Sequence, residues 1–86
     1  MLLDYIQAAM KRARYEILPD DRTFYGHIPE CQGVWANAAT LEECREELQS
    51  VLEDWILVKL RHADADLPVI EGINLNADIP TDQEVA

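Results

Sequence analysis

A single long amphipathic helix constrains the fold of this chain more than any other feature of its sequence. Thr40 and Glu43 have the spacing of a capping box, which marks the beginning of a helix. Beyond Thr40, apolar residues recur every three or four positions, as they do on one face of a helix. They are Leu41, Cys44, Leu48, Val51, Leu52, Trp55 and Ile56. We therefore predict a helix over residues 40–61, whose apolar face a chain of 86 residues must cover within a single core.

The residues before this helix predict a second helix and three strands. Helical spacing over residues 2–13 gives an apolar stripe, made of Leu2, Leu3, Ile6, Ala9, Met10 and Ala13. Residues 14–28 then form two strand-like segments around a turn at Pro19-Asp20-Asp21-Arg22, which is typical of a hairpin. Residues 34–38 fit a third strand. Gly26, inside the second strand, predicts a bulge or a close backbone contact.

The residues after the long helix carry weaker patterns. Pro68 cannot continue the helix, and residues 69–75 fit a short fourth strand that Gly72 weakens. Residues 76–86 lack periodicity and predict an acidic, flexible tail. The order of elements predicts an α+β fold. We expect one domain over residues 1–75, with a three- to four-stranded antiparallel sheet packed against the long helix and an extra N-terminal helix.

The charge of the chain limits its partners. Seventeen Asp and Glu face seven Lys and Arg, which gives a net charge of −10. Nucleic-acid binding depends on Lys and Arg, so we expect no direct contact with nucleic acid. The pairs Glu42/Glu46 and Glu43/Glu47 are four residues apart on the predicted helix and repel each other mildly. This surface is either simply solvated or it binds a basic protein, since opposite charges favour encounter.

The sequence gives no sign of a membrane or secreted protein. No stretch has the roughly 18 apolar residues of a membrane span, and the N-terminal residues lack a signal-peptide pattern. Cys31 and Cys44 are too few for the disulfide framework of a small secreted protein. We expect two free thiols and a cytoplasmic protein.

Two kinds of catalytic or metal chemistry are alternatives that the residues favour less. His27, Cys31 and Cys44 have no fourth ligand to close a tetrahedral zinc site. Cys31 with His27 or His62 has no orienting third group for nucleophilic catalysis. We therefore expect no enzyme activity, no metal and no cofactor.

The two tryptophans are the largest apolar side chains of the chain. Trp55 lies on the apolar stripe of the long helix and Trp35 on the third strand, so both are expected in the core. If Trp35 were exposed, it would instead be a good interface anchor, because Trp is enriched among the residues that contribute most to binding.

Several motifs together resemble the HicB antitoxin family of bacterial toxin–antitoxin pairs. The hairpin turn carries Asp20-Asp21, and Pro29-Glu30-Cys31-Gln32-Gly33 follows the second strand. Thr40-Leu41-Glu42-Glu43 then opens the amphipathic helix. The order and spacing match the family pattern over residues 14 to about 70. Each motif alone is weak, but the combination is fairly specific.

This resemblance implies a partial RNase H-like fold without nuclease activity. Family members bind and mask HicA, a small, basic, RNA-cleaving toxin, and usually carry a C-terminal DNA-binding domain. The chain departs from the pattern at Ala38-Ala39, where the family usually has Gly-Asp, and in its N-terminal helix. Residues 71–86 are too short and too acidic for the DNA-binding domain, so autorepression is not expected.

The sequence thus predicts a HicB-like antitoxin that masks a toxin by charge and bulk. The predicted partner-binding residues are Glu30, Trp35, Glu42, Glu43, Glu46, Glu47 and Glu53. The main alternative is a homo-oligomer without a toxin, with the stripe of the N-terminal helix as its contact. A dimer is the expected state in either case, because edge strands and an extra amphipathic helix favour pairing.

Overall fold

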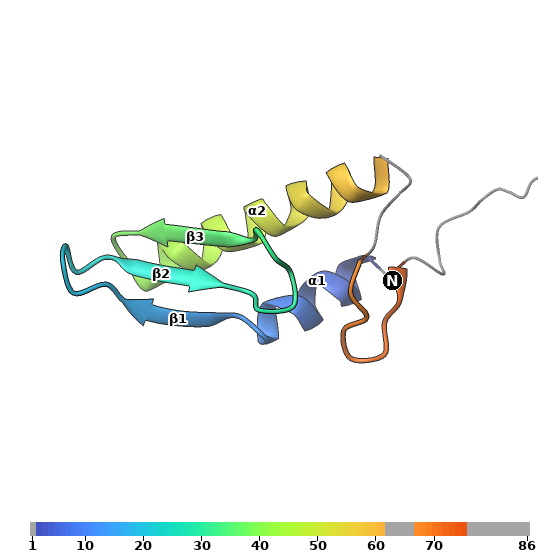
Figure 1. Cartoon of the computed structure of the whole chain (residues 1–86), viewed down its shortest axis with the longest axis horizontal. Coiled ribbons are helices and arrows are strands. Elements are labelled where there is room, and N and C mark those ends of the chain that lie inside the picture. Colours follow the sequence, from blue (N-terminus) through green and yellow to red (C-terminus); the bar gives the residue numbers. More distant parts are fainter. Residues whose placement is uncertain (1, 62–66, 76–86) are drawn as a thin grey trace, which may run out of the picture.

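The computed structural model describes residues 2–61 and 67–75 and shows two helices and a three-stranded antiparallel sheet (Figure 1). The predicted α+β class is therefore confirmed. The elements are α1 (Leu2–Lys11), β1 (Arg14–Ile17), β2 (Phe24–His27), β3 (Trp35–Ala38) and α2 (Leu41–Arg61).

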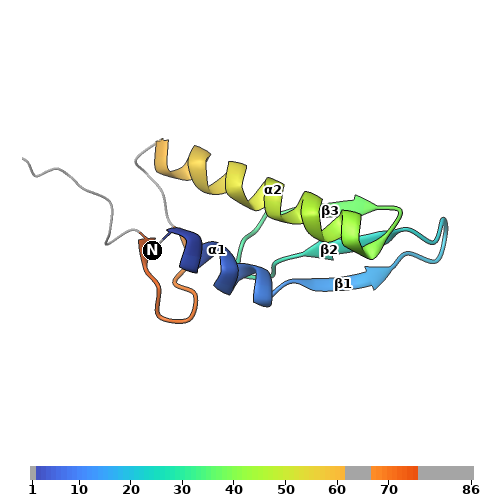
Figure 2. The same cartoon turned by 180° about the vertical axis from the view of Figure 1, so that it is seen from behind.

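The sheet has the order β1-β2-β3 and is covered by a helix on one side. β2 pairs with β1 and with β3 in a continuous antiparallel register, in which His27 lies between Arg14 and Trp35. α2 packs over β3 and β2, and Figure 2 shows it in front of the sheet. Figure 1, seen from the other side, has no helix in front of the sheet. One face of the sheet is thus packed on α2, and the other is left open by the described residues.

The predicted boundaries hold to within one or two residues, as helix and strand ends usually do. α1 ends at Lys11 rather than residue 13, because the amides of Arg12 and Ala13 donate to carbonyls only three residues back. The long helix begins at Leu41, with Thr40 as its N-cap: the Glu43 amide donates to Thr40 Oγ1 over 3.1 Å. Within the described chain, the return bond of the capping box, from Glu43 to the Thr40 amide, is not made.

Gly26 makes the close contact that its position predicts, without a bulge. The register of β2 runs through Gly26 without an inserted residue. A Cβ atom there would lie 2.8 Å from the Tyr15 ring and 3.2 Å from Cys44 Sγ. Because Gly26 has no side chain, the sheet and α2 can lie close together at this position.

The predicted fourth strand over residues 69–75 is wrong. Ile70 pairs with Ile73 in a single isolated bridge, and their backbone groups exchange two hydrogen bonds. Between them, Glu71 and Gly72 both have positive φ, at 51° and 78°, as tight hairpin turns of type I′ require. The chain reverses at once, so it cannot extend along the edge of the sheet.

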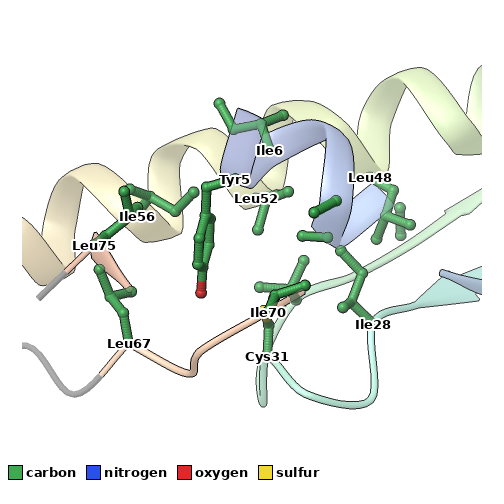
Figure 3. Packing of buried hydrophobic residues seen from close by; sticks show 14 of the residues in the cluster. Tyr5, Ile6, Ile28, Cys31, Leu48, Leu52, Ile56, Leu67, Ile70 and Leu75 are labelled. Carbon is green, nitrogen blue, oxygen red and sulfur yellow. The ribbon is translucent and has the colours of Figure 1, made fainter. Parts of the chain in front are cut away.

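This C-terminal segment instead closes the core. Leu67, Ile70 and Leu75 are buried beside α1 and α2 (Figure 3). Figure 3 shows the Tyr5 ring of α1 pointing toward this segment, and the Tyr5 hydroxyl donates to the Pro68 carbonyl over 2.7 Å. The segment thus covers the part of α2 that extends beyond the sheet.

The apolar stripe predicted for the N-terminal helix is only partly correct. Leu2 and Leu3 are exposed, whereas the buried residues of α1 are Tyr5, Ile6, Ala8 and Ala9. The helix is rotated toward Tyr5, because the Tyr5 ring packs in the hydrophobic core and its hydroxyl has a hydrogen-bond acceptor in the Pro68 carbonyl. Since the buried face of α1 belongs to the core, it is not free to hold a second chain.

Candidate protein-binding surfaces

The outer side of α2 forms an acidic surface, which we call the acidic face. Its members are Glu42, Glu43, Glu46, Glu47, Glu53 and Asp54, and all are exposed. In the part of the chain that the structure describes, none of these carboxylates forms an ion pair. One hydrogen bond links Gln49 Nε2 to Glu53 Oε2 over 3.1 Å. The negative charge of this face is therefore open to a partner.

Helix geometry explains the spacing of the acidic face. Residues three and four apart lie next to one another along a helix, so Glu43 and Glu47 form adjacent charges. Glu42 and Glu43 are favourable in the first turn, where the helix dipole is positive. Glu46, Glu47 and Glu53 lie beyond that turn and have no such compensation.

Two exposed apolar residues extend the acidic face toward the C-terminal end of α2. Leu57 and Val58 are 57% and 55% exposed and follow Asp54 on the outer side of the helix. The sequence analysis did not identify these two residues. Their position outside the predicted apolar stripe of the helix could have indicated that they are exposed. A partner that covers the acidic face can therefore also bury apolar surface.

Glu30 lies apart from α2 and already has a partner in the chain. It follows Pro29 after β2, and Arg12 Nη1 donates to Glu30 Oε2 over 2.8 Å. That hydrogen bond lowers the pKa of the Glu30 carboxyl. Glu30 thus links the end of α1 to the loop after β2.

Trp35 is exposed, so its predicted place in the core is wrong. Val34 and Ala36 are buried on the α2 side, and the two-residue period of a strand puts Trp35 on the other side, where it is 55% exposed. Its ring stacks on Tyr25, with centroids 6.1 Å apart, and Tyr25 stacks on His27 at 5.6 Å. Trp55 is half-buried on α2, with Lys59 Nζ 5.4 Å from its ring centre.

The seven predicted residues therefore lie on three surfaces. The five glutamates of α2 share the acidic face, Trp35 lies on the far side of the sheet, and Glu30 lies in the loop beside Arg12. The predicted partner-binding residues therefore do not form one continuous surface.

The cysteines are placed as small apolar groups. Cys31 and Cys44 are free and buried, and Cys44 Sγ donates to the Ala36 carbonyl over 3.6 Å. No group of three potential metal ligands occurs within residues 2–61 and 67–75. His62, the other candidate partner of Cys31, lies outside the described residues, as does the predicted tail 76–86.

Because the Cys31 thiol is buried, the free energy of unfolding is expected to fall at alkaline pH. Burial, with a smaller contribution from the Glu30 carboxylate, raises the pKa of the Cys31 thiol from 9.0 to about 11. A raised pKa in the folded state favours folding at low pH, and this contribution is lost as pH rises from about 9 to 11. We expect the free energy of unfolding, measured in urea, to fall by roughly 2–3 kcal/mol over that range. Cys31→Ala should remove much of the fall; an unchanged pH profile in that variant would contradict the assignment.

No helix of the described chain has both the length and the apolar character needed to cross a membrane.

Comparison with known proteins relates the chain to a protein family and to a solved structure. A family model described as UPF0150-like matches residues 4–68. The crystal structure of TTHA0281 from Thermus thermophilus is 43% identical in sequence and superposes with a TM-score of 0.74. This similarity covers 80% of the present chain and 84% of that chain. Among curated proteins, none matches the chain.

Proposed function

Because the chain belongs to the UPF0150-like family, we propose that it is a HicB-like antitoxin, a non-enzymatic protein that binds and masks a small, basic, RNA-cleaving toxin. The match covers α1 from Asp4 onward, the whole sheet and α2, so it includes the acidic face and all three strands. In this proposal the sheet and α2 are the partial RNase H-like fold of the HicB family.

The acidic face is the observation that carries this proposal. Six exposed carboxylates without ion-pair partners in the described chain lie along one helix. A toxin that cleaves RNA must hold phosphate groups with Lys and Arg. A rigid row of carboxylates offers those cations an alternative partner of the same charge sign as RNA. The antitoxin therefore competes with RNA for one basic surface, and its bulk keeps RNA away from the toxin.

The charge pattern also determines how the complex responds to salt. Surface charges are screened beyond about 8 Å at physiological ionic strength. Complementary charges mainly accelerate association, so added salt should slow binding more than it speeds release. Leu57 and Val58, at the end of the acidic face, supply the apolar contact that salt does not weaken.

Capture and reconstitution test the proposal together. The full chain, tagged and expressed at its native level, should retain a small, basic protein in a fixed ratio, identified by mass spectrometry. That protein, purified alone, should cleave RNA and arrest growth when expressed, and the full chain should suppress both effects at a fixed molar ratio. A captured protein that does not cleave RNA, or cleavage that the chain leaves unchanged, would contradict the antitoxin function.

A further inference from the structure

The side of the sheet opposite α2 carries a second surface, which we call the open sheet face. Its residues alternate with those that pack on the helix, and they come from all three strands. They are Arg14, Glu16, Tyr25, His27, Trp35 and Asn37. No element of the described chain covers this face (Figure 1).

The register arranges these residues in two rows. Arg14, His27 and Trp35 lie side by side across the three strands, and Glu16, Tyr25 and Asn37 form the next row. In each row the residue on β2 is an aromatic ring, and the residues on β1 and β3 differ from each other. The two edge strands therefore carry unlike, complementary groups.

A hollow and an exposed indole ring lie at opposite edges of the open sheet face. The hollow has a volume of about 480 Å³ and is lined by Arg14, Tyr15, Glu16 and His27, on the β1 side. Trp35 is exposed on β3, in the same row as Arg14, and its ring stacks on Tyr25. A two-fold axis parallel to β2 exchanges the two edges, so it brings Trp35 of each copy over the hollow of the other. The Arg14 guanidinium then faces the indole ring, which is a favourable cation–π arrangement.

Charge decides which surface a second copy can approach. The open sheet face holds one cation, Arg14, and one carboxylate, Glu16, so it is neutral. The whole chain has a net charge of −10, and the acidic face of one copy repels that of another. Charge repulsion therefore opposes self-association least at the open sheet face. The two-fold axis also places each row of one copy opposite the same row of the other copy, with the two ends exchanged.

From this neutrality and this symmetry, we propose that the open sheet face binds a second copy of the chain, with Trp35 of each copy seated in the hollow beside Arg14 of the other. Packed sheets lie about 10 Å apart, a gap that Trp and Arg side chains span. The proposal rests on the sheet and is independent of the acidic face and its toxin.

The size of the face sets the strength of the dimer. Three strands of four residues form a face of about 14 Å by 13 Å. The area of this face is well below the roughly 800 Å² that each partner buries in a standard interface. We therefore expect a reversible dimer with a Kd on the order of 100 μM, not an obligate one.

Sedimentation equilibrium of the full chain, from about 10 μM to 1 mM, measures this association. Trp35→Ala should raise the dimer Kd at least about 30-fold, because a Trp side chain seated in a hollow of the partner copy contributes most to such an interface. Leu57→Ala is the matched control, since Leu57 is 57% exposed and Trp35 55%, but it lies on α2 and should leave the Kd unchanged. A wild-type chain that stays monomeric at 1 mM would overturn the proposal.

A second variant protects the test against misfolding of Trp35→Ala. Arg14→Ala changes an exposed side chain and should raise the Kd about 10-fold through the lost cation–π contact. If neither variant shifts the Kd, or if Leu57→Ala shifts it equally, the interface lies elsewhere. If the chain is monomeric and Trp35→Ala instead abolishes toxin binding, the face belongs to the toxin and the dimer is refuted. Reversing charges on α2 should leave the dimer intact, which separates this test from that of the antitoxin function.

Discussion

Replacing both Glu43 and Glu47 by lysine is expected to weaken binding of the proposed basic toxin at least about 100-fold. The two carboxylates lie one turn apart on the acidic face, and neither has an ion-pair partner in the described chain. Each reversal removes one attraction and adds one repulsion at the same site, and close charge pairs across interfaces contribute about 1.5 kcal/mol or more. Isothermal titration calorimetry at low and moderate salt measures the change. The difference between wild type and variant should shrink as salt is added.

A control must change the net charge by the same amount elsewhere. Asp20→Lys with Glu71→Lys does so, since both residues are exposed and lie outside α2. This variant should bind the toxin within a few-fold of wild type. If both double variants lose affinity equally, only the overall charge matters and the acidic face is a solvated surface. If neither loses affinity, the toxin binds elsewhere.

Replacing Gly26 by valine should destabilise the fold by about 3 kcal/mol or more. The first added carbon would lie 2.8 Å from two Tyr15 ring carbons and 3.2 Å from Cys44 Sγ. Cys44 is fully buried and hydrogen-bonded to Ala36, so it cannot move aside. α2 must therefore shift away from the sheet or Tyr15 must leave its place. The urea midpoint, followed by the helical circular dichroism signal, reports the loss.

A double-mutant cycle identifies the cause of this loss. Gly26→Ala should destabilise less than Gly26→Val, and Tyr15→Leu should recover part of the loss because it removes the ring that the new Cβ meets. Gly33→Ala is a useful contrast: Gly33 has φ of 94° with open space around it, so its cost comes from the backbone alone and Tyr15→Leu should not change it. Additive effects of Gly26→Ala and Tyr15→Leu would show that crowding against the ring is not the cause.

The sequence alone predicted the elements that local patterns define. The threonine cap and the three-and-four spacing located α2, because helix periodicity and capping depend on neighbours within one or two turns. The Pro-Asp-Asp turn and the alternating residues located the hairpin, and a lone glycine in β2 pointed to a close contact. The acidic outer side of α2 also followed from the spacing of its glutamates.

Tertiary structure decided where those elements expose or bury their side chains. Trp35 is apolar enough for the core, but the pairing of β3 with β2 and the position of α2 put it on the open side of the sheet. Residues 69–75 have a strand-like composition, yet the turn at Glu71-Gly72 and the burial of Ile70 place them beside α1. Glu30 is separated from Arg12 by eighteen residues, and only the fold brings them together. Such contacts depend on segments distant in sequence, whose mutual placement no local spacing encodes.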